Sequence, residues 1–460
     1  MKKKLLGLAL GAVALTTAAT LTSCADKDVF HIYCWNQEFQ GFFNKYISDE
    51  KTDKADVYHL DGKEVKWTQV TSDGGAYQKS LDEALANNKK AKKSEKVDMF
   101  LAEADYIVKY ADSTLTKDVT SIGVSKDDMK NTYNYTVQAA SDAKGVVKGV
   151  SFQCCPAGMI YRTDIAEKVL NVKTPEQMQE LVSDWSKFDE VAAKMKASGY
   201  YMTGSYADTY RVFSNNAAAP WVDSDNNLTI PTVVNTWMEQ ADNYIKNGYT
   251  KPAGVWDADK TKEFTASGKA FCTFGPAWYY NFSMGTAQNG EAELEADGKT
   301  EKKDANGNVI YKEGTNTFGK WNVIKGPQSH FWGGTWALAA EGGDDDALVA
   351  KVMKACLSED FSNNIIKNDG QFSNNKVANA NYAKSGKGND FLGGQNDTQI
   401  WVDMADSIQF KNNTIYDQQC NEGLQTEYVK YLKGAVKTKE EAISSFYSYI
   451  KTQFPAIKTK

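Results

Sequence analysis

The sequence has few of the residues on which metal-dependent and nucleophilic enzymes rely. It contains only three histidines, His31, His59 and His330, and they lie far apart along the chain. A histidine-based zinc site or a Ser-His-Asp triad is therefore not expected. The Walker A loop, the G-x-S-x-G motif and the dinucleotide fingerprint are also missing from any supporting strand–helix context. We expect no cofactor and no metal at the functional site.

Cysteine is scarce and shows no metal-ligand spacing. There are seven cysteines and no C-x-x-C pair. Cys24 ends the N-terminal apolar run and is treated separately below. The others lie mostly in apolar stretches, which favours small buried hydrophobic side chains. A disulfide, including a strained one between Cys154 and Cys155, remains open in an exported protein. The six others are Cys34, Cys154, Cys155, Cys272, Cys356 and Cys420.

Only the first residues form a long apolar run. Met1-Lys2-Lys3-Lys4 is followed by apolar residues to Leu21 and then by Thr22-Ser23-Cys24. This pattern is typical of an export signal, and no later run approaches the roughly 18 apolar residues of a membrane span. The end of the run resembles a bacterial lipobox, which implies a signal peptide over 1–23, a lipidated Cys24 and a tether over 24–28. The alternative is an ordinary signal peptide with an incidental cysteine.

The charge of the chain is mildly acidic. Removal of residues 1–23, which carry three lysines and no acid, would take the formal net charge from −6 to −9. This charge argues against nucleic acid as a partner. The remaining chain is too long for one hydrophobic core and favours two domains.

Strand-like and helix-like segments alternate along the first part of the chain. Strands are predicted at 29–35, 64–70 and 97–102, with helical spacing after each of them. Asp73 is placed to cap the second of these helices. This alternation predicts an α/β fold in which mostly parallel sheets carry helices on both faces.

Later segments predict further helices and one insertion. The spacing over 174–199 predicts a single helix with Thr174 as its N-cap and Pro175 at its first position. Thr438 and Glu441 predict a capping box. Residues 285–318 are polar and predict a surface insertion with a hairpin turn at Asn306-Gly307.

Aromatic residues are abundant, whereas the residues of typical catalytic and metal sites are scarce. The chain has 11 Trp and 24 Tyr, many of them at predicted strand ends or loops. Trp35 and Asn36 end the first strand, Trp278 follows an apolar strand, and Trp332 and Trp336 flank Gly333-Gly334. Ligands of open α/β sheets bind outside the carboxyl ends of the strands. Aromatic faces there suit a ligand with apolar C–H faces and hydroxyl edges, which favours carbohydrate.

Four segments resemble bacterial extracellular solute-binding lipoproteins of ABC transporters, of the carbohydrate-binding type (extracellular solute-binding protein family 1). The resemblance covers essentially the whole chain. In the last segment Ser373 stands where proline is usual in the family. The segments are 97–113, 268–280 (GKAFCTFGPAWYY), 331–360 and 369–379.

The resemblance implies a two-lobed periplasmic-binding-protein-like fold with a hinge around a central cleft. Residues 29–153 and 334–392 would form lobe 1, and 154–333 and 393–460 would form lobe 2. Chain crossings are expected near Cys154-Cys155, near Gly333-Gly334 and within 385–395. The two indoles around the glycines share a face if the strand is regular there, and we expect both in the cleft; a bulge would separate them.

The resemblance also implies how a sugar would be held. Trp278 takes the family's sugar-stacking position, and carboxylates and an arginine would hydrogen-bond to sugar hydroxyls. For Arg211 a salt bridge that holds its own loop is an equal alternative. The expected ligand-binding residues are Trp35, Asn36, Glu38, Glu103, Asp105, Tyr206, Asp208, Arg211, Trp278, Trp332 and Trp336.

The function implied is that of a monomeric, non-enzymatic binding protein. It would capture a sugar or oligosaccharide, close by hinge motion and deliver the ligand to ABC transporter permease subunits. Its place would be the outer face of the cytoplasmic membrane, held in the lipid bilayer by its N-terminal lipid. A surface-anchored glycoside hydrolase remains an alternative, because a catalytic carboxylate pair cannot be judged from composition. An oligosaccharide-binding adhesion lipoprotein is another alternative, because it would share the anchor but need no lobe closure. The identity of the sugar is open, and another polar solute is not excluded.

Overall fold

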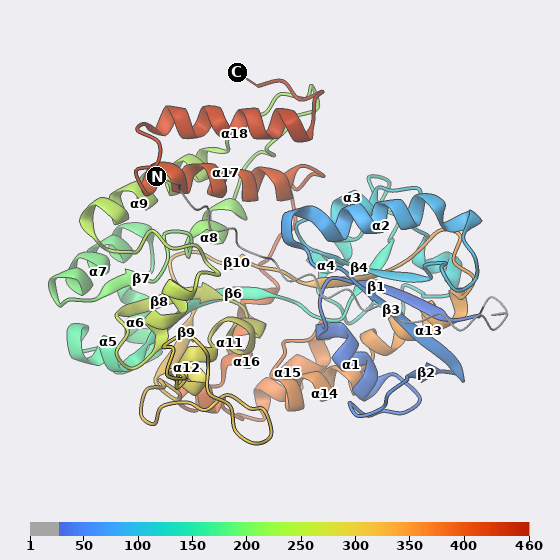
Figure 1. The fold of residues 1–460 in the computed structure, drawn as a ribbon, viewed down its shortest axis with the longest axis horizontal. Helices are drawn as coiled ribbons and strands as arrows, with labels where there is room; N and C mark the ends of the chain where they lie inside the picture. Colours follow the sequence, from blue (N-terminus) through green and yellow to red (C-terminus); the bar gives the residue numbers. More distant parts are fainter. Residues whose placement is uncertain (1–26, 460) are drawn as a thin grey trace, which may run out of the picture.

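The computed structural model describes residues 27–459, and its strands form two separate sheets (Figure 1). The first sheet has the order β2-β3-β1-β4-β11-β5, and we call it, with the helices packed on it, lobe 1. Its strands are β1 (Phe30–Cys34), β2 (His59–Leu60), β3 (Lys63–Gln69), β4 (Met99–Glu103), β5 (Gly149–Ser151) and β11 (Thr335–Ala339).

The second sheet, in lobe 2, has the order β10-β6-β8-β7, with β9 paired to β6. The chain enters it between Ser151 and Pro156 and leaves it between Phe331 and Thr335. These two passages include the positions at which the first two crossings are expected. The strands are β6 (Pro156–Arg162), β7 (Tyr201–Thr203), β8 (Ala270–Gly275), β9 (Trp321–Ile324) and β10 (His330–Phe331).

Both sheets are mixed, so the expectation of mostly parallel sheets is wrong. In lobe 1 only the pairs of β1 with β3 and with β4 are parallel, whereas β11 runs antiparallel to β4 and β5. In lobe 2, β6 runs antiparallel to β8, β9 and β10. The reason is connectivity. β11 joins the lobe 1 sheet directly from lobe 2, and β6 joins the lobe 2 sheet directly from lobe 1. Neither strand therefore follows a strand–helix–strand unit, which would make neighbouring strands parallel.

Helices cover both faces of the lobe 1 sheet. Met99 and Leu101 of β4 pack with α1, α13 and α14, while Phe100 and Ala102 point to the opposite face with α2 and α3. This alternation is the two-residue period of a strand that is buried on both sides. The helices are α1 (Glu38–Tyr46), α2 (Ala76–Asn87), α3 (Ile107–Ala111), α4 (Asn134–Ala139), α13 (Asp346–Leu357) and α14 (Glu359–Asp369).

The helices of lobe 2 include a C-terminal pair that lies along one end of the molecule (Figure 1). α17 and α18 pack on each other, and α17 also contacts α9. The helices are α5 (Thr163–Leu170), α6 (Pro175–Leu181), α7 (Trp185–Ala197), α8 (Tyr210–Ser214), α9 (Thr232–Asn247), α10 (Ala258–Thr261), α11 (Trp278–Ser283), α12 (Gly285–Asn289), α16 (Asp397–Ala405), α17 (Asp417–Leu432) and α18 (Lys439–Gln453).

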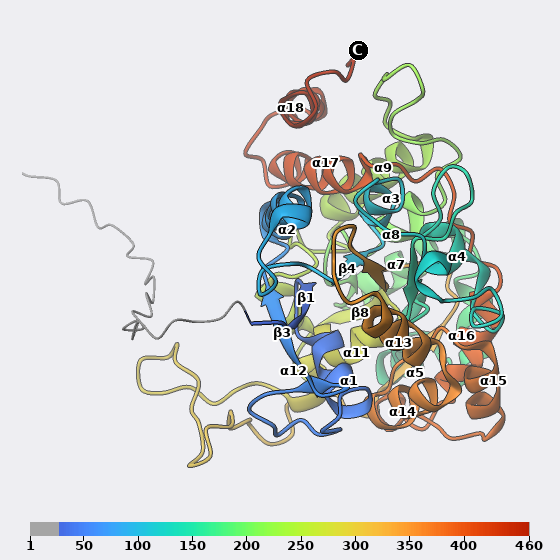
Figure 2. The same ribbon diagram turned by 90° about the vertical axis from the view of Figure 1, so that its right-hand side faces the viewer.

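A third connection lies between α15 (Lys376–Lys384) and α16. α15 packs on α14, and α16 packs on β6 and β9 of lobe 2. Residues 291–316 form antiparallel bridges, including Lys303 with Val309 around the turn at Gly307, and they project from the body (Figure 2). Within 27–459 no helix has the length and apolarity needed to cross a bilayer.

Helix ends show which local signals were sufficient. Thr438 forms the expected capping box, and Thr174 is the expected N-cap and also forms a capping box with Gln177. The helix expected over 174–199 is instead α6 and α7, because Asp184 accepts a hydrogen bond from Lys187 N and starts a second helix. Asp73 does not cap α2, which begins after Gly75 in the left-handed region.

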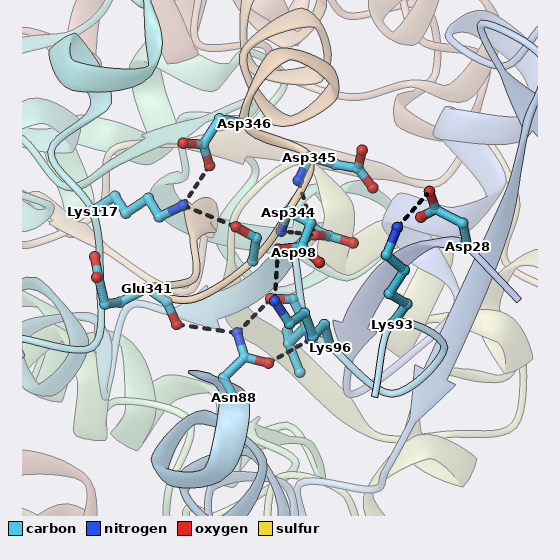
Figure 3. A network of polar contacts seen from close by, with 12 residues as sticks. Asp28, Asn88, Lys93, Lys96, Asp98, Lys117, Glu341, Asp344, Asp345 and Asp346 are labelled. Atoms are coloured by element: carbon cyan, nitrogen blue, oxygen red, sulfur yellow. Dashed lines mark hydrogen bonds and ion pairs between the residues drawn. The ribbon is translucent and has the colours of Figure 1, made fainter. Parts of the chain in front are cut away.

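A polar network holds the start of α13 against the lobe 1 sheet (Figure 3). Buried Asp98 accepts hydrogen bonds from the backbone N–H of His31, Asp344 and Asp345. Burial raises the pKa of Asp98 to about 6. Ion pairs surround it: Lys117 with Asp346, Lys96 with Asp344, Lys63 with Asp345 and Asp28, and Lys93 with Asp28. The lysines and aspartates of this surface therefore neutralise one another.

Candidate ligand-binding site

The two chain crossings meet beside Trp278. The backbone N–H of Trp332 donates to Cys155 O at 3.1 Å, which joins the crossings. Gly333 has a φ of +78°, and a Cβ on it would lie 3.3 Å from the indole of Trp278. Glycine is needed here both for the left-handed backbone and for the closeness of the indole.

An ion pair joins the two lobes. Arg211 lies on α8 of lobe 2, and Asp105 follows β4 of lobe 1. The guanidinium makes a bidentate pair with the carboxylate, with Nη1–Oδ1 at 2.6 Å, and each side chain is 17% exposed. A pair of this geometry is strong and directional. The alternative that Arg211 holds its own loop is thus replaced by a contact between the lobes.

Two carboxyl groups of lobe 1 have raised pKa values. Burial and the neighbouring Asp105 raise the pKa of Glu103 to about 8, while Arg211 acts in the opposite direction. Burial raises the pKa of Glu38 to about 7, although a 3.5 Å hydrogen bond from Gln153 opposes this. Both residues are half-buried. Protonated carboxyls can donate as well as accept hydrogen bonds, which suits hydroxyl groups.

Aromatic rings flank this polar centre from both lobes. Trp278 and Trp332 are half-buried and contact each other at 5.4 Å between ring centroids. Their contact is completed by a hydrogen bond from Trp278 Nε1 to Trp332 O at 3.2 Å. In lobe 1, half-buried Trp35 makes edge contacts with Tyr77 and Tyr106. Three of the expected tryptophans are thus partly accessible.

Trp336 lies in the core of lobe 1, so the expectation that it faces the cleft is wrong. It is fully buried, and its Nε1 donates to Thr136 O at 2.8 Å. Gly334 has a φ of +117°, so the segment around the glycines is not a regular strand. The two-residue alternation is broken there, and the indoles of Trp332 and Trp336 no longer share a face.

Asp208 and Tyr206 are also placed inside lobe 2 rather than in the cleft. Asp208 pairs with Lys260 at 2.5 Å, and the two side chains are 1% and 0% exposed. Thr273 Oγ1 and Ser205 N also donate to its carboxylate. Tyr206 is 6% exposed and packs against Trp237. Tertiary packing thus uses both residues as core, which their sequence neighbourhood did not indicate.

Asn36 has a local role. Its Oδ1 accepts the backbone N–H of Glu38 at 3.1 Å, at the start of α1. This bond fixes the turn that brings Glu38 towards Gln153.

Several further residues line this region that no sequence motif indicates. Glu422 of α17 has a raised pKa, first through burial and next through Asp105. Gln78 of α2 donates to Gln418 of α17, which makes a second contact between the lobes. Trp256 and Phe282 are exposed and contact Trp332 and Trp278, respectively. None of them belongs to a motif, so only tertiary contact reveals them.

An enclosed cavity of about 20 Å³ lies beside the ion pair. That volume has room for about one water molecule and not for a sugar ring. The cavity is lined neither by Trp278 nor by Trp35, so its volume does not describe the space beside those two rings. Its lining includes Asp105, Arg211, Asn215, Trp332, Asp417 and Asn421.

The cysteines and acidic groups show no sign of a metal centre. The six cysteines in the described part of the chain are buried and unpaired, so Cys154 and Cys155 form no disulfide with each other. Among residues 27–459, no cluster of three or more His, Cys, Asp or Glu side chains could hold an ion. Cys24 lies outside the described residues.

Comparisons with known proteins point in one direction. The family model described as bacterial extracellular solute-binding protein matches residues 61–391. No curated protein sequence matches the chain. A solved structure described as extracellular solute-binding protein family 1 has 18% identity and a TM-score of 0.70, covering 92% of this chain and 99% of its own.

Two sugar complexes share the fold. One is the ABC transporter associated binding protein from B. animalis subsp. lactis Bl-04 in complex with β-1,6-galactobiose, at 16% identity and a TM-score of 0.62, covering 94% of this chain and 100% of its own. The other is a cyclo/maltodextrin-binding protein complexed with maltotetraose, at 14% identity and a TM-score of 0.58, covering 95% and 100%. At these identities the likeness concerns the fold.

Proposed function

The chain belongs to the bacterial extracellular solute-binding protein family, and from this premise we propose that it captures a sugar or oligosaccharide between its lobes. The lobes would then close by hinge motion, and the closed form would deliver the ligand to the permease of an ABC importer. The observation that carries the proposal is the combination of half-buried indoles from both lobes, carboxyl groups of lobe 1 and the ion pair between Arg211 and Asp105.

The aromatic faces would hold the apolar side of the sugar. Trp278 and Trp332 lie together in lobe 2, and Trp35 lies in lobe 1. Closing the lobes on a sugar ring would remove water from these faces, which is the favourable part of the binding free energy.

The polar groups would satisfy the hydroxyls. Glu38, Glu103 and Asp105 offer carboxyl oxygens, and Arg211 offers a fork of N–H donors. Asp105 and Arg211 already satisfy each other in this structure. A sugar that hydrogen-bonds to Asp105 or Arg211 would replace one charge-assisted hydrogen bond with another. The ion pair would therefore hold the lobes together until the sugar either breaks it or adds hydrogen bonds to it.

The anchoring of the protein is a separate proposal. Cys24 would carry the lipid, and the protein would stand as a monomer on the outer face of the cytoplasmic membrane. The support is the lipobox-like sequence at Leu21–Cys24. Metabolic labelling with a fatty acid would test it, because Cys24→Ser should abolish incorporation.

Calorimetry against a panel of mono- and oligosaccharides tests the main proposal. We expect one class of sugar to bind intact, and Trp278→Ala to weaken it by about 2 kcal/mol, or roughly thirty-fold. Trp185→Ala is the matched control, because this half-buried indole stacks on Phe213 and packs against the core of lobe 2. Normal affinity in Trp278→Ala would remove the stacking role, and failure of every sugar would overturn the proposal.

A glycoside hydrolase is the second candidate. The observation that favours it is the pKa of Glu103, raised to about 8, because a general acid must hold its proton at neutral pH. The same samples should be assayed for new reducing ends over several hours. Release that persists in purified protein and is lost in Glu103→Gln would support the hydrolase; unchanged sugar would support transport.

A further inference from the structure

The two most exposed large hydrophobic side chains of the described residues lie next to each other. Phe282 is 69% exposed and Trp256 is 58% exposed. Their rings meet edge-on, with centroids 6.2 Å apart and planes at 87°. We call them the outer aromatic pair. Because exposed apolar surface is unfavourable in water, a contiguous pair of this kind points to a ligand or partner.

The outer aromatic pair is continuous with the rings of the candidate cleft. Trp256 contacts Trp332 at 5.5 Å, and Phe282 contacts Trp278 at 6.1 Å. Trp278 and Trp332 are in turn in contact with each other. The four rings therefore form one surface that runs from half-buried to exposed positions, with all members in lobe 2.

The local backbone holds the outer rings in place. Trp256 lies in a turn that is closed by a hydrogen bond from Gly254 N to Asp257 Oδ2 at 2.7 Å. Phe282 lies on α11, four residues after Trp278 and hence on the same side of the helix. Trp256 lies in this turn and Phe282 in a helix, so neither belongs to the projecting segment 291–316.

The surroundings favour a sugar chain over a protein partner. Asp257 and Asn281 beside the two rings are exposed and polar, and Asn281 Nδ2 reaches across to Asp369 O of lobe 1. Two aromatic rings in a polar setting suit alternating C–H faces and hydroxyl edges. A stable protein interface would need about 800 Å² on this side, far more than two side chains supply.

We infer that the ligand is an oligosaccharide whose first ring is enclosed against Trp278 and Trp332, and whose chain continues outwards over Trp256 and Phe282. This inference rests on the proposed sugar-binding function and specifies its substrate class. It assigns the outer aromatic pair as a site that distinguishes longer chains from single sugars.

The test is a length series. Dissociation constants are measured by calorimetry for malto-oligosaccharides and β-1,6-linked galacto-oligosaccharides of one to four rings. For the wild type we expect at least a ten-fold gain in affinity between one ring and three. The Trp256→Ala/Phe282→Ala double variant should lose about ten-fold for three rings and less than two-fold for one ring.

Tyr311→Ala is the matched control, because this ring is 42% exposed but lies in the projecting segment. It should leave all affinities unchanged. Equal loss at every length in the double variant, or no loss at any length, would overturn the inference while leaving sugar binding intact. A wild type that binds neither these two series nor any sugar of the wider panel would instead overturn the proposed function and this inference with it.

Discussion

Arg211 and Asp105 form a bidentate ion pair across the cleft, although they are 106 positions apart in sequence and belong to different lobes. Gln78 and Gln418 make a second direct contact between the lobes. We call this arrangement, in which polar contacts join the two lobes, the closed form.

Removing one partner of this ion pair should favour separation of the lobes. In Asp105→Asn, the guanidinium keeps its burial but loses its counter-charge, so the closed form loses on the order of 1–3 kcal/mol. We expect a larger radius of gyration by small-angle X-ray scattering in the absence of ligand. Asp82→Asn is the control, because its pair with Lys109 lies within lobe 1. Equal radii in wild type and Asp105→Asn would show that the pair does not hold the lobes together.

The closed form should be less stable at alkaline pH. Glu103 has a pKa of about 8 here against an ordinary 4.5, mainly through burial. Its proton is bound more tightly in this arrangement than in the unfolded chain, so the stabilisation is complete below pH 4.5 and is lost as the pH rises through 8. We expect the melting temperature to fall by roughly 2–4 °C between pH 6 and pH 9. Glu103→Gln should make this profile shallower and leave the part due to Glu38, whose pKa is raised to about 7; a profile as steep as the wild type's would assign the whole effect to other groups.

Trp336 should matter for stability and not for ligand affinity. Trp336→Phe keeps an aromatic ring but leaves Thr136 O without the indole donor, at a cost of about 1–3 kcal/mol in the free energy of unfolding. Denaturant unfolding measures this cost, and calorimetry should give an unchanged dissociation constant. Trp237→Phe is the comparison, because this buried indole has no hydrogen-bond partner. Its substitution should lower the free energy of unfolding by less than that of Trp336. A larger dissociation constant in Trp336→Phe would contradict this and indicate that Trp336 contacts the ligand.

Replacing one residue of the buried pair Asp208–Lys260 should lower the free energy of unfolding more than replacing both. Asp208→Asn leaves the Lys260 ammonium buried without a counter-charge and should cost about 3–5 kcal/mol in unfolding free energy. Replacing both residues, as Asp208→Leu with Lys260→Met, should cost less, because no charge is then left buried. Urea titrations of the single and double variants decide this, and a double variant less stable than Asp208→Asn would contradict the argument.

The expectations for Trp278 and Trp332 rest on local signals, and their role in ligand binding stays a prediction. Trp278 and Trp332 were placed near the cleft from short segments, and both are half-buried and in contact. Trp336 was misplaced because the two-residue alternation holds only for a regular strand, and Gly333 and Gly334 both have positive φ. Asp208 was misplaced because nothing near it in sequence shows that Lys260, 52 positions later, is buried beside it.

The sequence by itself determined the alternation of strands and helices, the N-cap at Thr174, the capping box at Thr438, and the resemblance that implied two lobes. These features depend on residues within a few positions of one another, where side-chain chemistry acts directly on the backbone. Only the tertiary structure decided the direction of β11, the burial of Trp336 and Asp208, the pairing of Arg211 with Asp105, and the exposure of Trp256 and Phe282. These depend on which distant segments meet, because the crossings bring together residues that share no local signal.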